Sequence, residues 1–156
     1  MSPRFRLIIR IEQWPLKTPF RITGHTWQSF EAVVAGLEAD GHCGFGEAAG
    51  VYYRGETSSY LKHQLESVRG EIESTDLTSE AIQELLPPGG ARNALDCALW
   101  DWKAKVAKRT VWQLANLPEP RPLITTFTCG AGSPASMAAT ARGYEGAKER
   151  GLSSLS

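Results

Sequence analysis

The chain has 156 residues, and its 17 Lys and Arg residues balance its 17 Asp and Glu residues, so no excess positive charge marks a nucleic-acid surface. A content of 42% hydrophobic and 22% charged residues is enough for a core and excludes a disordered tail. No apolar run approaches the roughly 20 residues of a membrane helix, and the first residues lack the apolar centre of a signal peptide. We therefore expect a soluble cytoplasmic protein that binds neither nucleic acid nor membrane.

Three cysteines, Cys43, Cys97 and Cys129, are widely separated and form no Cys-x-x-Cys pair. This pattern argues against a disulfide framework and against a structural zinc site. We expect the three thiols to be buried among apolar side chains.

Apolar and charged residues alternate over residues 5–12, and this period of two predicts a β-strand with one apolar face. Pro15 is expected to end the strand. Residues 16–24, which contain a second proline and a glycine, are expected to form a loop.

Residues 30–39 predict a second strand, and residues 42–47 predict a third. Asp40 and Gly41 between them form a pair typical of a hairpin turn. Three antiparallel strands should therefore open the chain.

Residues 60–72 then carry apolar side chains three or four positions apart, which is the spacing of a helix. Thr57 or Ser58 supplies its N-cap.

Further helices are predicted over residues 80–86, 91–107 and 111–117. Thr78 or Ser79 should cap the first of them, because a hydroxyl there can accept a backbone N–H of the first turn.

Residues 123–129 predict a new strand, and Ser133 before Pro134 predicts the start of a helix that runs towards Gly151. Strand, loop and helix in this order begin a βαβ unit, as in an α/β barrel or a doubly wound sheet. The sequence offers no second complete strand after it, so the second part is expected to be unfinished.

Four motifs stand out along the chain. They are Pro15-Leu16-x-x-Pro19-Phe20, Gly44-x-Gly46-Glu47-Ala48, Tyr53-Arg54-Gly55-Glu56 and Ala91-Arg92-Asn93-Ala94-Leu95-Asp96-Cys97-Ala98-Leu99-Trp100-Asp101. Their order and spacing resemble the muconate-lactonizing subgroup of the enolase superfamily. The closest resemblance is to the bacterial dipeptide epimerases that act on L-Ala-D/L-Glu and related dipeptides.

The resemblance implies an α+β capping domain with a three-stranded antiparallel sheet plus helices, followed by the start of an α/β (TIM-like) barrel. On this basis residues 1–90 are the capping domain, which acts as a lid and sets specificity. Residues 91–122 are a helical connection, and residues 123–156 are the first barrel strand and helix.

In that family the resemblance implies a Mg²⁺ held by acidic residues at the ends of the third, fourth and fifth barrel strands, where it stabilises an enediolate. Two lysines, one from the second strand and one from the sixth, move the α-proton of a small dipeptide substrate. Homo-oligomers are also expected.

Neither the catalytic lysines nor the metal ligands of the family match any residue of this sequence. The first lysine pair would be expected between Gly146 and Ser156, and no Lys-x-Lys pair occurs there. Lys148 lies among charged neighbours, which is typical of a solvated helix face. We therefore expect a catalytically incomplete chain with no catalytic residue and no bound metal of its own.

Four residues are candidates for substrate contacts in a complete enzyme: His25, Tyr53, Arg54 and Thr128. His25 lies where related epimerases have an arginine at or next to this position, and it is either a specificity residue or an ordinary loop histidine. Tyr53 and Arg54 belong to a second loop, which is either a lid over the site or a loop packed on its own domain. Thr128 ends the predicted barrel strand, at the end where barrel active sites form.

Asp96 and Asp101 are better explained structurally than as an acid and base pair, with Arg92 expected to form an i,i+4 ion pair with Asp96. Glu47 is expected to be a hydrogen-bonding strut at a strand end. An alternative from another functional class also remains, in which the chain is a non-catalytic binding or oligomerisation module.

Overall fold

The structure is a computed structural model that describes residues 3–123, 126–145 and 154–155. Its contacts divide the chain into two compact units. The first comprises Met1–Trp14 with Phe30–Glu119, and the second comprises Pro15–Ser29 with Pro120–Ser156. The long helix that follows residue 90 therefore belongs to the same unit as the sheet. The domain boundaries expected at residues 90 and 122 concern the complete fold and stay a prediction.

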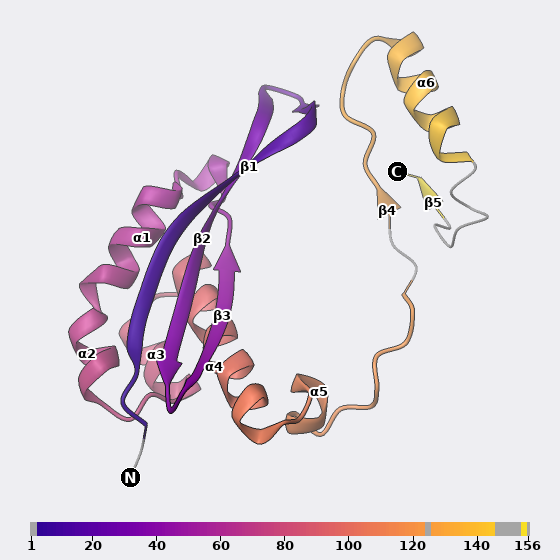
Figure 1. The fold of residues 1–156 in the computed structure, drawn as a ribbon. Helices are drawn as coiled ribbons and strands as arrows, with labels where there is room; N and C mark the ends of the chain where they lie inside the picture. Colours follow the sequence, from indigo (N-terminus) through magenta and orange to yellow (C-terminus); the bar gives the residue numbers. More distant parts are fainter. Residues whose placement is uncertain (1–2, 124–125, 146–153, 156) are drawn as a thin grey trace. The chain divides into compact units, whose positions relative to one another are not determined.

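Three strands form one antiparallel sheet in the order β1, β2, β3 (Figure 1), as predicted. They are β1 (Arg6–Ile22), β2 (His25–Ala39) and β3 (His42–Ala48). Asp40 and Gly41 join β2 to β3 with φ angles of 51° and 73°. Two positive φ values are what a type I′ hairpin turn requires, and this turn sets the register that pairs Ala39 with His42.

β1 continues through Pro15 and Pro19 to Ile22, so the expectation that Pro15 ends the strand is wrong. Of the loop expected at residues 16–24, only the turn at residues 23–24 is present. The backbone N–H and C=O of Leu7 bond to helix side chains and therefore face the free edge of β1. Alternate residues of a strand direct these groups to the same side, and both prolines lie an even number of residues after Leu7. Their missing N–H groups then fall on the free edge, where a sheet tolerates proline.

Helices pack on one face of this sheet (Figure 1). They are α1 (Ser58–Ser67), α2 (Arg69–Ser74), α3 (Ser79–Leu85) and α4 (Gly90–Ala107), followed by the short α5 (Val111–Leu114). The single helix predicted over 60–72 is wrong, because it is interrupted at Val68. The β-branched side chain of Val68 is buried in the core, and its backbone leaves the helical region at φ −108° and ψ 10°.

The predicted N-caps of α1 and α3 are confirmed. The hydroxyl of Thr57 accepts the N–H of Tyr60 at 3.1 Å. The hydroxyl of Thr78 accepts the N–H of Ala81 at the same distance. Each cap satisfies a backbone donor that the first helical turn cannot satisfy itself.

The core lies between the inner face of the sheet and the helices. Its fully buried members include Val33, Leu37, Leu61, Leu65, Ile72, Ile82, Leu95 and Leu99. Trp102 closes it by donating its indole N–H to the carbonyl of Ala39 at 3.1 Å. Its ring also meets the ring of Phe5 edge-on, with centroids 4.8 Å apart.

Two glycines bring β3 directly onto α4. A Cβ on Gly44 would lie 2.2 Å from the carbonyl oxygen of Ala98, and one on Gly46 would lie 2.1 Å from that of Ala94. The backbones of strand and helix therefore touch without side chains between them, which fixes the end of β3 beside the first turns of α4.

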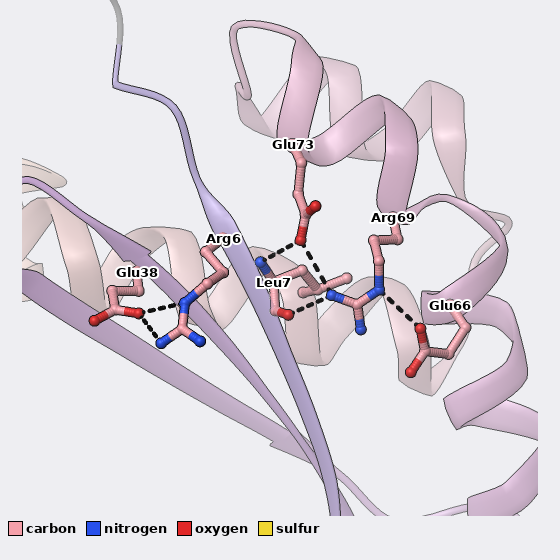
Figure 2. A network of polar contacts seen from close by, with 6 residues as sticks. All are labelled: Arg6, Leu7, Glu38, Glu66, Arg69 and Glu73. Carbon is pink, nitrogen blue, oxygen red and sulfur yellow. Dashed lines mark hydrogen bonds and ion pairs between the residues drawn. The ribbon is translucent and has the colours of Figure 1, made fainter.

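An ion-pair network joins β1 to α2 (Figure 2). Glu73 accepts the backbone N–H of Leu7 at 3.0 Å, and Arg69 donates to the carbonyl of Leu7. Arg69 also pairs with Glu73 at 3.1 Å and with Glu66 at 2.9 Å. The hydrogen bond from Arg69 lowers the pKa of Glu66 and is the main cause of the raised pKa of Arg69.

The second unit contains β4 (Thr126–Phe127), α6 (Pro134–Glu145) and β5 (Ser154–Leu155). The strand expected over 123–129 is wrong in extent, because β4 pairs in parallel with only the two residues of β5 and gains no longer ladder among the described residues. Ser133 caps α6 as predicted, since its hydroxyl accepts the N–H of Ser136 at 3.2 Å. Residues 146–153, with Lys148, lie outside the described part.

The expectation of buried thiols is wrong. Cys97 is exposed, and Cys43 and Cys129 are half-buried; all three are free cysteines. α4 buries the face that carries Ala94, Leu95 and Ala98, and Cys97 lies off that face.

In the part of the chain that the structure describes, every helix is too short or too polar to cross a bilayer.

Candidate functional site

The sheet unit carries a pocket of about 760 Å³ beside the middle of β1 and β2 and the end of β3. Its apolar wall includes the exposed rings of Trp14 and Phe30 together with Ala32. Its polar lining comes from four side chains, namely Glu47, Arg54, Glu56 and Asn93. An apolar wall with a few charged and amide groups is the usual make-up of a site for a small polar molecule.

Arg54 reaches this pocket from a single turn of 3₁₀ helix, η1 (Tyr52–Arg54). The N–H of Arg54 bonds to the carbonyl of Val51 at 2.9 Å, and the N–H of Gly55 bonds to that of Tyr52 at 3.1 Å. Gly55 ends the turn with a φ of 71°, in the left-handed region that favours glycine.

Tyr53 lies beside Arg54 in the same turn, but its side chain is 74% exposed and does not line the pocket. Its ring meets that of Tyr52 edge-on at 5.2 Å. Of the predicted contact residues, Tyr53 and Arg54 are therefore brought together, and only Arg54 faces the pocket.

Glu47 also lines the pocket, yet no hydrogen bond holds its carboxylate among the described residues, so the predicted strut is wrong. Its position opposite Val34 in the register puts it on the outer face of the sheet. The strut is instead Glu56, whose carboxylate accepts the N–H of Val51 at 3.2 Å.

The two aspartates of the long helix have structural surroundings. Asp101 accepts the N–H of Phe45 at 2.8 Å and pairs with Lys105 at 2.6 Å. The ion pair expected between Arg92 and Asp96 is wrong: Oδ1 of Asp96 is buried without a hydrogen-bond partner in the described chain, and both residues line a pocket of about 350 Å³.

The second unit has a smaller pocket of about 320 Å³. Thr128, which directly follows β4 and is exposed, lines this pocket. Its other charged or hydroxyl-bearing residues are Thr18, Arg21, Ser136 and Thr140. The N–H of Ala131 bonds to the carbonyl of Arg21 at 2.6 Å and so ties the strand to the loop before α6.

His25 also belongs to the second unit, where it begins β2 and does not line this pocket. Its ring lies edge-on to that of Trp27 with centroids 4.1 Å apart. Trp27 in turn lies 5.8 Å from the ring of Phe20. His25 thus sits in an aromatic cluster within a strand, and it is not an isolated loop residue.

Sequence reasoning missed several pocket residues: Trp14, Arg21, Glu56 and Asn93. Glu56 and Asn93 fall inside motifs that were singled out, so the signal was present without a role attached to it. Arg21 was hidden because its segment was expected to be a loop.

Across the described residues, no three side chains of His, Cys, Asp or Glu are grouped closely enough to hold a metal ion. The described residues therefore do not offer the ligand set of the Mg²⁺ site that the family implies.

A model of the mandelate racemase / muconate lactonizing enzyme N-terminal domain matches residues 4–115. The chain belongs to this family. The resemblance inferred from the four motifs is thereby confirmed, and the matched range covers the sheet and helices α1 to α5.

Among curated relatives, this family member is 39% identical over 130 residues to the L-Ala-D/L-Glu epimerase of Escherichia coli strain K12. That match covers 83% of this chain and 40% of the relative. The chain thus spans about 40% of the length of this relative.

Two solved structures are similar in fold. An enolase family member from Agrobacterium tumefaciens with homology to dipeptide epimerases, with bound sodium and L-Ala-L-Glu, has a TM-score of 0.84 and 29% identity over 92% of this chain and 44% of its own. The dipeptide epimerase of Methylococcus capsulatus, complexed with Mg and L-Arg-D-Lys, has a TM-score of 0.83 and 25% identity over 99% of this chain and 45% of its own.

Proposed function

We propose that this family member is the capping part of a dipeptide epimerase, an isomerase that inverts the α-carbon of one residue of a dipeptide such as L-Ala-D/L-Glu. The observation that carries the proposal is the 39% identity to the E. coli L-Ala-D/L-Glu epimerase across 83% of this chain. The capping fold is consistent with it, because a cap supplies substrate contacts and excludes water, while the proton transfer is done elsewhere.

Mg²⁺ is the expected cofactor of the complete enzyme, by analogy with the Methylococcus relative that was solved with Mg and a dipeptide. A divalent cation next to a substrate carboxylate makes the neighbouring α-proton more acidic. Because the described residues form no metal cluster, the cap's own contribution is to bind and orient the dipeptide.

Four residues of the chain are assigned to substrate contact in this proposal. Arg54 offers a guanidinium to a substrate carboxylate from the rim of its pocket, and the exposed Tyr53 beside it covers the bound dipeptide. His25 and Thr128 contact the substrate side chain in the complete enzyme. Charge-assisted hydrogen bonds of this kind fix orientation as well as affinity.

A direct test measures deuterium incorporation from heavy water into L-Ala-L-Glu by the purified chain with added Mg²⁺. We expect no exchange at the α-carbon, because the cap lacks proton carriers in this proposal. Turnover by the chain alone would contradict that part.

A chimera tests the capping role itself. Residues 4–115 of this chain replace the matching segment of the E. coli relative, and exchange into L-Ala-L-Glu is measured with and without Mg²⁺. We expect Mg²⁺-dependent exchange. A folded chimera that binds no dipeptide would rule the proposed function out.

The alternative is a non-catalytic module that pairs with itself or with a relative. Its motivation is β4, whose described pairing is limited to the two residues of β5 and leaves backbone groups for another strand. A mass measurement on the purified chain distinguishes the two: a homo-oligomer favours self-association, and a monomer with β4 protected from hydrogen exchange argues against it.

A cytoplasmic location is part of the proposal. Cys43, Cys97 and Cys129 are free thiols, as is usual for proteins of a reducing compartment. Cell fractionation with an antibody to the chain would test this assignment.

A further inference from the structure

The turn that carries Tyr53 and Arg54 is short and lies outside the core. It is a single turn of 3₁₀ helix, and none of its residues is buried. Two backbone hydrogen bonds, Arg54 to Val51 and Gly55 to Tyr52, close it. A turn this short is not stable by itself in water, so an additional contact must keep it in one conformation.

Glu56 supplies that contact. Its side chain accepts the N–H of Val51 at 3.2 Å, and its own N–H donates to the carbonyl of Val51 at 3.3 Å. The residue after the turn is therefore bonded through both side chain and backbone to the residue before it. Gly50 lies so close that a Cβ there would meet the carbonyl oxygen of Glu56 at 2.0 Å.

The other carboxylate oxygen of Glu56 lies beside the start of α4. A Cβ on Gly89, the N-cap residue of α4, would be 3.1 Å from Oε1 of Glu56. The first turn of a helix carries unpaired N–H groups and a partial positive charge, which favour a carboxylate. Glu56 thus lies between the turn and the start of an 18-residue helix that is anchored in the core.

From these contacts we infer that Glu56 is a positioning residue, which holds the turn Tyr52–Arg54 so that Arg54 faces the pocket where the dipeptide binds. This inference rests on the proposed function. Arg54, Glu56 and Gly89 all line the same pocket, so a shift of the turn would move the guanidinium within it.

The first test uses the full chain and needs no substrate. Glu56→Ala should speed hydrogen exchange at the amide of Val51 and tryptic cleavage after Arg54, each by roughly tenfold, while the amides of α1 keep their rates. Glu56→Gln should restore much of the protection, because its amide oxygen can still accept the N–H of Val51. Glu84→Ala, at an exposed residue of α3, is the matched control and should change neither rate.

The second test uses the chimera with the E. coli relative. Glu56→Ala should raise KM for L-Ala-L-Glu by about tenfold and change kcat far less, and Glu56→Gln should lie between it and the parent. An inactive parent chimera would count against the proposed function, yet the exchange and cleavage data would still decide the role of Glu56. Unchanged exchange at Val51 in Glu56→Ala, or equal defects in Glu56→Gln and Glu56→Ala, would overturn the inference.

Discussion

Glu73 binds the backbone of Leu7 at the sheet edge, where a neighbouring strand would otherwise pair. Its carboxylate accepts the backbone N–H of Leu7 at 3.0 Å, while Arg69 one helical turn earlier donates to the carbonyl of the same residue (Figure 2). One ion pair on α2 thus satisfies both outward-facing backbone groups of a buried edge residue.

Removing the carboxylate of Glu73 should destabilise the sheet unit. Glu73→Ala leaves the N–H of Leu7 without its partner and removes one of the two carboxylates that pair with Arg69. We expect a loss of about 1 to 2 kcal/mol in the free energy of unfolding. Urea unfolding measures it, and the exchange rate of the Leu7 amide should rise as well. Glu71→Ala, at an exposed residue of the same helix, is the control and should lie within about 0.5 kcal/mol of the parent.

Acid should weaken the same network through Glu66. Its pKa is lowered by the hydrogen bond from Arg69, so its contribution is present above the ordinary value of 4.5 and is lost as the pH falls through the lowered one. The side chain is 39% exposed, so solvent screening limits the effect to at most about 1 kcal/mol. The free energies of unfolding of Glu66→Gln and the parent should therefore differ at neutral pH and converge as the pH falls through the lowered pKa. A difference that grows on acidification would contradict this.

The contact between β3 and α4 should tolerate no side chain at Gly46. Gly46→Ala would place a Cβ 2.1 Å from the carbonyl oxygen of Ala94, so strand and helix must separate, at a cost of about 3 kcal/mol or more in thermal or urea unfolding. Gly70→Ala in α2 is the matched control, because a Cβ there meets nothing within 4 Å. It should be neutral or should stabilise by up to about 1 kcal/mol.

Cys97 should react slowly with alkylating reagents although it is exposed. Neighbouring atoms partly desolvate its sulfur, and this desolvation raises the pKa of the thiol above 9.0; the Asp96 carboxylate raises it further. Less of the thiol is therefore thiolate near pH 8. Iodoacetamide labelling in a Cys43→Ser, Cys129→Ser background should be slower than that of free cysteine. Asp96→Asn should speed it by removing the negative charge, and an unchanged rate would show that Asp96 has no influence.

Arg54 should affect substrate binding in the chimera with the E. coli relative. Arg54→Ala is expected to raise KM for L-Ala-L-Glu by at least about tenfold, since a charge-assisted hydrogen bond is lost, and Arg54→Lys should retain part of the affinity. Lys62→Ala removes an exposed cation from α1 and should leave KM unchanged. Equal KM values for Arg54→Ala and Lys62→Ala would remove Arg54 from the site.

Features that depend on neighbours in the sequence were predictable. The Asp40-Gly41 turn and the caps at Thr57 and Thr78 follow from local backbone requirements, and all are found. The effect of Pro15 was not predictable, because it depends on whether its nitrogen faces another strand or the free edge, which only the assembled sheet determines.

The site shows the same limit. The motif that contains Arg54 and Glu56 marks the right segment, but the division of labour between them comes from contacts with Val51 and with the start of α4. Glu47 appeared to be a strut from its place after two glycines, whereas its carboxylate lies on the open face of the sheet. Side-chain partners across the fold cannot be read from one segment.

The prolines of β1 have a consequence for how the folded chain meets other molecules. A strand of another molecule that paired with the free edge of β1 would find no N–H donor at the two prolines. At Leu7 it would find a backbone N–H that already bonds to α2. Such gaps interrupt the ladder that amyloid-like stacking needs, so the longest strand of the protein is a poor template for aggregation.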